Sequence, residues 1–220
     1  FSSLVYEVNG TLVEYLETQV RNLPVDLRLG QEVTPALVRQ LKPDVIVVAV
    51  GARREAPPIP GVDRANVLSG DDLRNLMTGS DQSVAVEKLS RAQRAMLKVG
   101  GLLGVSDRIA LTRELTRHWM PLGKRLAIIG GGLVGVELAE FLSERGRQVT
   151  VLEEGSNLAV EMALPRRWRV LYTLREHGVS LLTAAHVEEI TDDGVVYTQG
   201  GARKTATADH VILAAGVREN

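Results

Sequence analysis

A glycine-rich turn between an apolar run and an amphipathic segment constrains the fold of this chain more than any other feature. Residues 126–129 are apolar and lead into GGGLVG at 130–135, which matches the pattern GxGxxG. In such a turn Gly130 permits the sharp bend off a strand, Gly132 lets a diphosphate approach the backbone, and Gly135 lets a helix pack closely on the sheet. The N-terminal end of that helix would face phosphate with its positive dipole.

The residues on either side of the turn predict a strand–turn–helix–strand unit. Arg145 and Gly146 predict the end of the helix, with a cation in the last turn and a left-handed stop. A second buried strand is predicted for residues 148–152. Four apolar residues recur at helical spacing and predict a core-facing stripe: Val134, Leu138, Phe141 and Leu142.

A carboxylate ends the second strand at the distance that dinucleotide recognition requires. Glu153 lies 18 residues after Gly135, close to the roughly 20-residue interval at which an acidic residue meets the adenosine ribose. We expect Glu153 to accept hydrogen bonds from the ribose hydroxyls, and the alternative is a solvated strand end. A 2′-phosphate would meet both Glu153 and Glu154, so the sequence favours NADH over NADPH.

Composition excludes several classes of function. The chain has 220 residues, 45% of them hydrophobic and 24% charged, with a net charge of −1, so we expect no nucleic-acid partner. No apolar run is long enough for a membrane span, no leader is recognised, and a cytoplasmic location is the default expectation. The absence of cysteine excludes disulfides, thiolate metal sites and iron–sulfur ligation within these residues. The four histidines show no metal-ligand spacing, so we predict no metal site.

The first 79 residues read as alternating helices and strands. We predict a helix over residues 10–21, a strand over 23–27 and a helix capped by Thr34 with Pro35 at its first position. Residues 44–50 are almost wholly apolar and β-branched, which predicts a parallel strand buried on both faces. Ser69 and Asp72 resemble a capping box.

Residues 80–123 form a cationic segment with the pattern of a helical insert. Arg91, Arg94 and Lys98 would share one helical face. Such a face is usually solvated or packs on a neighbouring domain, although it could dock an acidic partner or a membrane surface.

After Glu154 the pattern returns to a helix and then to strands. We predict a helix from Pro165 to His177, with Trp168, Leu171 and Tyr172 facing inward, and a strand over 179–182. Residues 187–207 predict an antiparallel meander with turns at 192–194 and 200–201, and a final strand follows over 209–215.

The chain also resembles itself. Residues 44–53, DVIVVAVGAR, match residues 209–218, DHVILAAGVR, in residue class and without a gap. Only the second copy is preceded by a GxGxxG. We therefore expect an α/β chain: a Rossmann-like NAD(P)-binding domain, with a parallel sheet and an antiparallel meander, joined to a second, FAD-type nucleotide domain truncated at its amino end. The expected boundaries are 1–79 for the partial FAD-type domain, 80–123 for the insert, 124–216 for the NAD(P)H domain and 217–220 for the return.

These motifs resemble the flavoproteins with two dinucleotide domains, in which an NAD(P)H domain is inserted into an FAD domain. The stretches KRLAIIGGGLVGVELAEFLSERGRQVTVLEE, HWMPLG and ALPRRWRVLYTLREHGV are similar to the carboxy-terminal half of 2-enoate and 2,4-dienoyl-CoA reductases. That resemblance implies FAD between the two nucleotide domains. It also implies an amino-terminal barrel, outside this sequence, that carries FMN and an iron–sulfur cluster.

The resemblance also implies roles for individual residues. The ribose acid falls on Glu153, and Glu137 corresponds to a glutamate near the nicotinamide, or else is a carboxylate in the first helical turn. Val187 and Gly216 match positions whose backbone faces the nucleotide, or else are plain strand ends. The pyrophosphate turn falls on Gly130, Gly131, Gly132, Leu133, Val134 and Gly135, and the FAD-contacting loop falls on Val50, Gly51, Ala52 and Arg53.

One position departs from the family pattern: Val50 stands where threonine is usual, so only a backbone contact with FAD is implied there. Arg53 would reach the flavin's phosphate or ribose, or is a surface arginine.

The leading hypothesis is a fragment of a flavin-dependent reductase that takes hydride from NADH, passes it to FAD and on to the barrel, and does not turn over alone. We assign no catalytic residue, because hydride transfer belongs to the cofactors. Two alternatives stay open: a fragment of a pyridine nucleotide-disulfide reductase or NADH oxidase, and a non-catalytic dinucleotide-sensing module.

Overall fold

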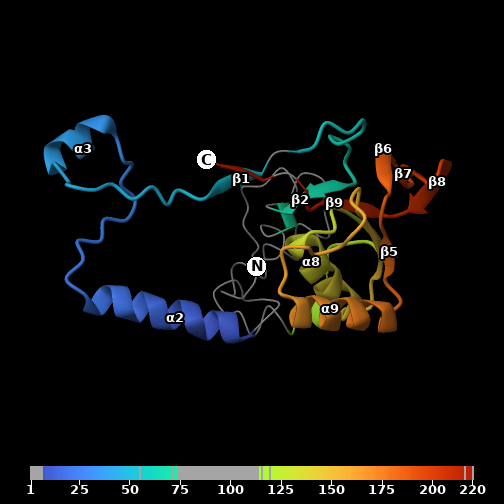
Figure 1. Ribbon diagram of the computed structural model, residues 1–220, viewed down its shortest axis with the longest axis horizontal. Helices are drawn as coiled ribbons and strands as arrows, with labels where there is room; N and C mark the ends of the chain where they lie inside the picture. Colours follow the sequence, from blue (N-terminus) through green and yellow to red (C-terminus); the bar gives the residue numbers. More distant parts are fainter. Residues whose placement is uncertain are drawn as a thin grey trace.

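A five-stranded parallel sheet forms the centre of the folded part on the right of Figure 1. The computed structural model describes residues 7–54, 56–70, 72–73, 114, 116–118, 120–215 and 217–219. The strands lie in the order β2 (Val67–Ser69), β9 (His210–Leu213), β3 (Arg125–Ile129), β4 (Gln148–Leu152) and β5 (Ser180–Leu182). Since β3 lies between β4 and β9, the direction of strand order reverses at the end of β3, which is where nucleotide sites form in open sheets.

Two helices cover one face of this sheet. Helix α8 (Leu133–Ser143) joins β3 to β4, and α9 (Leu164–Glu176) joins β4 to β5. The side chains of Phe141 and Leu142 in α8 are fully buried in one core with Leu126 and Ile128 of β3. The predicted strand–turn–helix–strand unit is therefore confirmed.

A three-stranded antiparallel sheet covers the opposite face. It consists of β6 (His186–Thr191), β7 (Gly194–Gln199) and β8 (Ala202–Thr207), in that order, which confirms the predicted meander. Ile190 and Val195 of this meander pack with Ala127 and Ile129 of β3 in a second core. Successive residues of β3 thus face opposite cores, as the alternation of side chains along a strand requires.

The inward face of α9 differs from the prediction. Trp168 and Tyr172 are exposed, at 72% and 53%, and their rings stack with centroids 5.9 Å apart. Val170 and Leu174 are buried instead, and Leu171 is partly buried. Helical spacing shows which residues share a face, but α9 has two faces with apolar residues, and its contact with α8 decides which one is buried.

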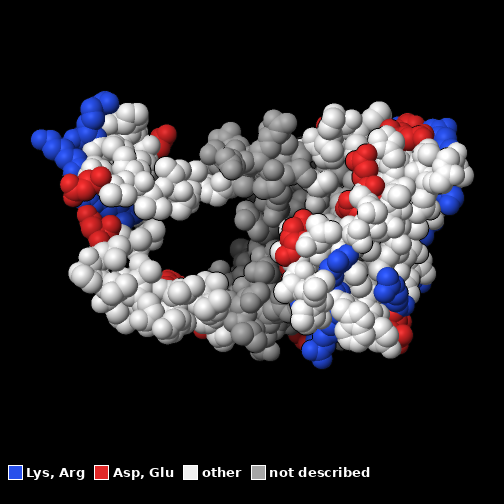
Figure 2. All heavy atoms as spheres, viewed as in Figure 1, with Lys and Arg blue, Asp and Glu red and all other residues white. Residues whose placement is uncertain are grey.

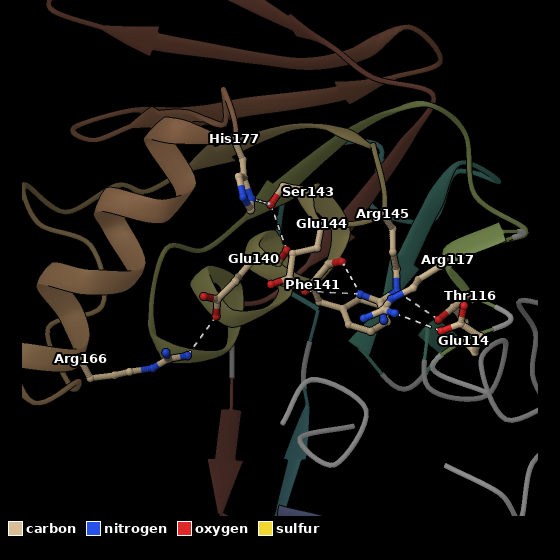
Figure 3. A network of polar contacts seen from close by, with 10 residues as sticks. All are labelled: Glu114, Thr116, Arg117, Glu140, Phe141, Ser143, Glu144, Arg145, Arg166 and His177. Carbon is tan, nitrogen blue, oxygen red and sulfur yellow. Dashed lines mark hydrogen bonds and ion pairs between the residues drawn. The ribbon is translucent and has the colours of Figure 1, made fainter. Parts of the chain in front are cut away.

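The C-terminal end of α8 carries a polar network, shown in Figure 3. The guanidinium of Arg145 lies over the ring of Phe141, with its central carbon 3.5 Å from the centroid, and donates to Thr116 Oγ1 at 3.1 Å. Arg166 Nη2 bonds Glu140 Oε2 at 3.0 Å and so joins α9 to α8. Burial raises the pKa of Glu140, because it disfavours the charged carboxylate.

The amino-terminal helices lie apart from the central sheet (Figures 1 and 2). Helix α2 (Glu7–Asn22) agrees with the predicted helix, and α3 (Pro35–Leu41) begins as predicted, with Thr34 Oγ1 accepting from Leu37 N at 3.3 Å. The strands predicted for residues 23–27 and 44–50 are wrong, because both segments have no strand assignment and their side chains are exposed. A strand needs neighbours, and within the described part of the chain no strand pairs with either segment.

A short antiparallel pair brings two distant segments together. β1 (Ala52–Arg54) pairs with β10 (Val217–Glu219), and Arg53 lies opposite Arg218. β1 and β10 lie at the ends of the two copies of the internal repeat. The copies nevertheless differ in structure, because the second copy contains the buried strand β9, whereas residues 44–50 of the first copy are exposed and form no strand. The predicted capping box is confirmed, with Ser69 N bonding Asp72 Oδ2 at 2.9 Å and Asp72 N bonding Ser69 Oγ at 3.0 Å. The helical insert predicted for residues 80–123, with its cationic face, lies almost wholly outside the described residues.

Candidate dinucleotide site

The glycine turn leaves β3 at the carboxyl edge of the parallel sheet. Gly130 has φ of +107°, a left-handed conformation that side-chain-bearing residues rarely adopt, and a Cβ there would lie 2.8 Å from the carbonyl carbon of Ala214. A Cβ on Gly135 would overlap the carbonyl oxygen of Gly130. Both positions therefore need glycine for the fold itself, whereas Gly132 has an extended backbone with φ of −69°.

The carboxylate at the end of β4 is bonded to this turn. Glu153 Oε2 accepts from Gly131 N at 2.7 Å, and its Oε1 accepts from Gly155 N at 2.7 Å. A carboxylate has about four acceptor positions, so two remain for hydroxyl donors. Glu153 is therefore both a structural link and a group available to a ribose.

A cleft of about 510 Å³ lies beside the turn and Glu153. This volume is within the usual range for small-molecule sites, about 300–1,000 Å³. The walls come from the ends of β3 and β4, the start of β6, Ala215 and a proline-rich loop. The lining residues are Pro57, Pro58, Ile59, Pro60, Ile129, Gly130, Leu152, Glu153, Glu154, Ala185, His186, Val187, Glu188 and Ala215.

The polar side chains of the cleft are mainly acidic. Glu154 Oε1 lies 2.9 Å from His186 Nδ1, and both side chains are largely exposed. Glu188 accepts hydrogen bonds from Thr198 and Arg203, and these bonds lower the pKa of its carboxyl group. These carboxylates would repel a 2′-phosphate in the cleft.

The structure brings together only some of the predicted site residues. Gly130, Glu153, Glu154 and Val187 line the cleft. Gly131 is buried in the turn. Gly132, Leu133, Val134 and Gly135 form the turn and the first turn of α8.

Two expectations on α8 are corrected. Val134 is 49% exposed and does not belong to the core stripe, because it lies in the first turn of α8, where Leu133 is also exposed. Glu137 is the fifth residue of α8, so it lies beyond the first helical turn, where the alternative reading had placed it. Glu137 is half-buried, and burial is the main cause that raises the pKa of its carboxyl group. The nearby negative charge of Glu140 raises this pKa further.

The predicted FAD-contacting loop lies elsewhere. Val50 and Gly51 are exposed and do not line the cleft, and Ala52 and Arg53 belong to β1. Gly216 lies outside the described residues. The described part of this loop therefore lies apart from the cleft.

Sequence reasoning missed the proline-rich wall of the cleft. Ile190 N donates to Pro60 O at 2.8 Å, so the loop is fastened to the meander. The run Pro57-Pro58-Ile59-Pro60 indicated a stiff loop, but no local pattern indicates what such a loop faces.

Among the described residues, no helix has both the length and the apolar character to cross a bilayer. In the same part of the chain, no three His, Asp or Glu side chains cluster as a metal site would require.

A parallel sheet with a glycine turn at its switch point, and a carboxylate bonded to that turn, defines a Rossmann-like dinucleotide-binding protein. The sequence pattern of the family described as pyridine nucleotide-disulphide oxidoreductase matches residues 25–220. The chain belongs to this family of oxidoreductases.

Individual relatives are longer than this chain. This chain is 29% identical to the bilirubin reductase of Mediterraneibacter gnavus over 97% of this chain's length. It is 28% identical to the metal reductase of Desulforamulus reducens over 93% of this chain's length. The chain covers only 27% and 29% of those proteins, about a quarter of their length. A solved structure of 2-naphthoyl-CoA reductase with 2-naphthoyl-CoA has the same fold, with a TM-score of 0.65 and 23% identity, over 94% of this chain and 25% of that one.

Proposed function

We propose that the protein binds NADH at the glycine turn and the adjacent cleft, with the diphosphate over the N-terminus of α8. The observation that carries this proposal is the bond from Gly131 N to Glu153 Oε2, which holds the phosphate turn and the ribose acid in one unit. The adenosine would lie along Glu153 and Val187 in the cleft. NADH is preferred over NADPH because Glu153, Glu154 and Glu188 surround the region that a 2′-phosphate would enter.

When bound, the nicotinamide would supply a hydride to a flavin, and the protein's own residues would bind and orient the nucleotide and exclude water. Glu137, in the second turn of α8, is the carboxylate that we propose lies nearest the nicotinamide. Two further segments would contact the nucleotides. Gly216 would lie beside the bound nucleotide, and the FAD would be contacted by the loop Val50, Gly51, Ala52 and Arg53.

We further propose that residues 1–79 and 217–220 belong to an FAD-type domain. The support is the pairing of β1 with β10 and the exposed apolar side chains of residues 45–50, which are 60–83% exposed where an exposure is given. Exposed apolar runs of this kind are unusual in isolated globular chains. In the finer form of the proposal, electrons pass from FAD to an amino-terminal barrel with FMN and an iron–sulfur cluster, which reduces an enoate or enoyl-CoA double bond.

A second candidate is a fragment of a pyridine nucleotide-disulfide reductase or NADH oxidase. The family match over residues 25–220 favours it, as does 24% identity to the NADH oxidase of Thermoanaerobacter brockii over 92% of this chain. Addition of NADH to the full-length polypeptide, with an enoyl-CoA, a disulfide and oxygen as separate acceptors, distinguishes the two.

Bleaching of the flavin followed by reoxidation with enoyl-CoA alone supports the barrel form. Reoxidation by a disulfide or by oxygen supports the second candidate. Binding of NADH without bleaching would identify a sensing module, and no binding of NADH would contradict the proposed function.

A further inference from the structure

Helix α8 begins without a cap from its own sequence. Its N-cap residue is Gly132, which has no side chain to accept a hydrogen bond, and the first turn contains no acidic residue. The first N–H groups of any α-helix lack partners within the helix, and the dipole makes this end attractive to an anion. The helix therefore depends on a group from outside.

A carboxylate from the loop after β4 fills this role. Glu161 Oε2 accepts from Leu133 N at 3.3 Å. A Cβ added to Gly132 would lie 3.3 Å from Glu161 Oε1, so the carboxylate lies directly over the second fixed glycine. This is the place that a dinucleotide diphosphate takes in a GxGxxG turn.

Buried anchors hold the loop that carries Glu161. Leu158 and Ala159 are 5% and 1% exposed, and Ala159 N donates to Gly131 O at 2.7 Å. Arg167 Nε donates to Leu158 O at 2.7 Å. Ala159 has φ of +47°, a conformation that is costly for alanine and that persists only where its surroundings impose it. The position of Glu161 is thus determined by packing against the turn itself.

We propose that Glu161 is an internal competitor of the nucleotide: its carboxylate caps α8 in the free protein and is displaced when the diphosphate binds. This inference rests on the proposed NADH site. A carboxylate and a diphosphate cannot share the same N–H groups, and their like charges repel. Glu161 is exposed on its outer side, so it can turn into solvent while Leu158 and Ala159 stay buried. Glu161 therefore lowers the affinity for NADH and makes release of the nucleotide easier.

The test is titration of the protein with NADH, comparing the wild type with Glu161→Gln, Glu161→Asp and Glu176→Gln. Glu161→Gln removes the charge, and the expected result is NADH binding that is tighter by about two- to fivefold, the range that exposed charges at a helix N-terminus produce. Glu161→Asp keeps the charge, but its shorter side chain withdraws the carboxylate from Leu133 N. This variant should therefore also bind NADH more tightly. Glu176 is an exposed carboxylate at the far end of α9, and Glu176→Gln controls for net charge.

If Glu161→Gln binds NADH more tightly but Glu161→Asp does not, the effect is long-range charge repulsion. That result would overturn the proposal that Glu161 is a cap displaced by the diphosphate. Weaker NADH binding in Glu161→Gln would make Glu161 a ligand contact and overturn the proposal as well. A second readout is thermal unfolding without nucleotide, in which loss of the cap should lower the Tm of Glu161→Gln relative to Glu176→Gln. If the wild type and Glu161→Gln both fail to bind NADH, the proposed function fails, whereas equal binding refutes only this inference.

Discussion

Glu153 Oε2 accepts a hydrogen bond from Gly131 N at 2.7 Å, so the end of β4 is bonded to the turn that follows β3. The carboxylate that would recognise a ribose is therefore also part of the scaffold. Its neighbour Glu154 is different, because its side chain is 78% exposed and its described partner, His186, is 67% exposed. The two adjacent carboxylates should respond differently to substitution.

We predict that Glu154→Arg increases affinity for NADPH about tenfold, with little change in stability, because a cation replaces a carboxylate near the 2′-position. Glu153→Arg should instead lower the free energy of unfolding by about 1–3 kcal/mol, since it leaves the N–H groups of Gly131 and Gly155 without their acceptor. Parallel titrations with NADH and NADPH, combined with urea denaturation, measure both effects. Equal loss of stability in the two variants would contradict the assignment.

The glycines of the turn should divide into structural and binding positions. Gly135→Ala places a methyl group against the carbonyl oxygen of Gly130 and should destabilise the protein by about 1–3 kcal/mol. Gly132→Ala fits the backbone, with 3.3 Å to the nearest atom of Glu161, so the fold should survive while NADH affinity falls at least about tenfold. Circular dichroism melts and NADH titrations separate these outcomes, and normal NADH binding by Gly132→Ala would argue against a diphosphate at this turn.

His210 should make stability depend on pH. Gly123 N donates to His210 Nδ1 at 3.1 Å, and burial lowers the pKa of the imidazole, with Asp209 opposing and Arg147 reinforcing the shift. As the pH falls below about 6.5, the unfolded chain binds a proton that the folded chain does not, so stability is complete above that pH and declines below it.

The measurement is urea denaturation between pH 7.5 and 5.5, with His210→Asn as the comparison, since asparagine keeps an acceptor near the same place. The stability of the wild type should decline more steeply than that of the variant over this range. Parallel pH profiles would refute the role of His210.

The two faces of α9 provide a test of the corrected packing. Leu174 is fully buried, and Leu174→Ala should cost about 2–5 kcal/mol. Trp168→Ala, at an exposed position where the ring stacks on Tyr172, should cost less than about 1 kcal/mol. Chemical denaturation of the two variants measures both values, and the reverse order would restore the inward-facing Trp168 that periodicity suggested.

Local patterns predicted most elements of the NAD(P)H domain. Residues 126–154 specify strand, turn and helix by short-range chemistry, and the turn at Gly146 follows the end of α8 as expected, with φ of +69°. The predictions for residues 23–27 and 44–50 failed for a physical reason. An apolar, β-branched run indicates a strand only when other strands lie beside it, and residues 209–213 have β2 and β3 as neighbours while 44–50 have none in the described chain.

The sequence alone determined the class of fold and the place of the glycine turn, because glycine spacing, helix ends and strand alternation are set by neighbours within about twenty residues. Only the tertiary structure decided what meets at that turn. Pro57–Pro60, His186 and Glu161 come from separate segments, and their approach to Gly130 and Gly132 depends on packing of the meander and of the loop after β4. Long-range packing of this kind is not encoded in any local pattern, which is why the carboxylate over the turn was found only in three dimensions.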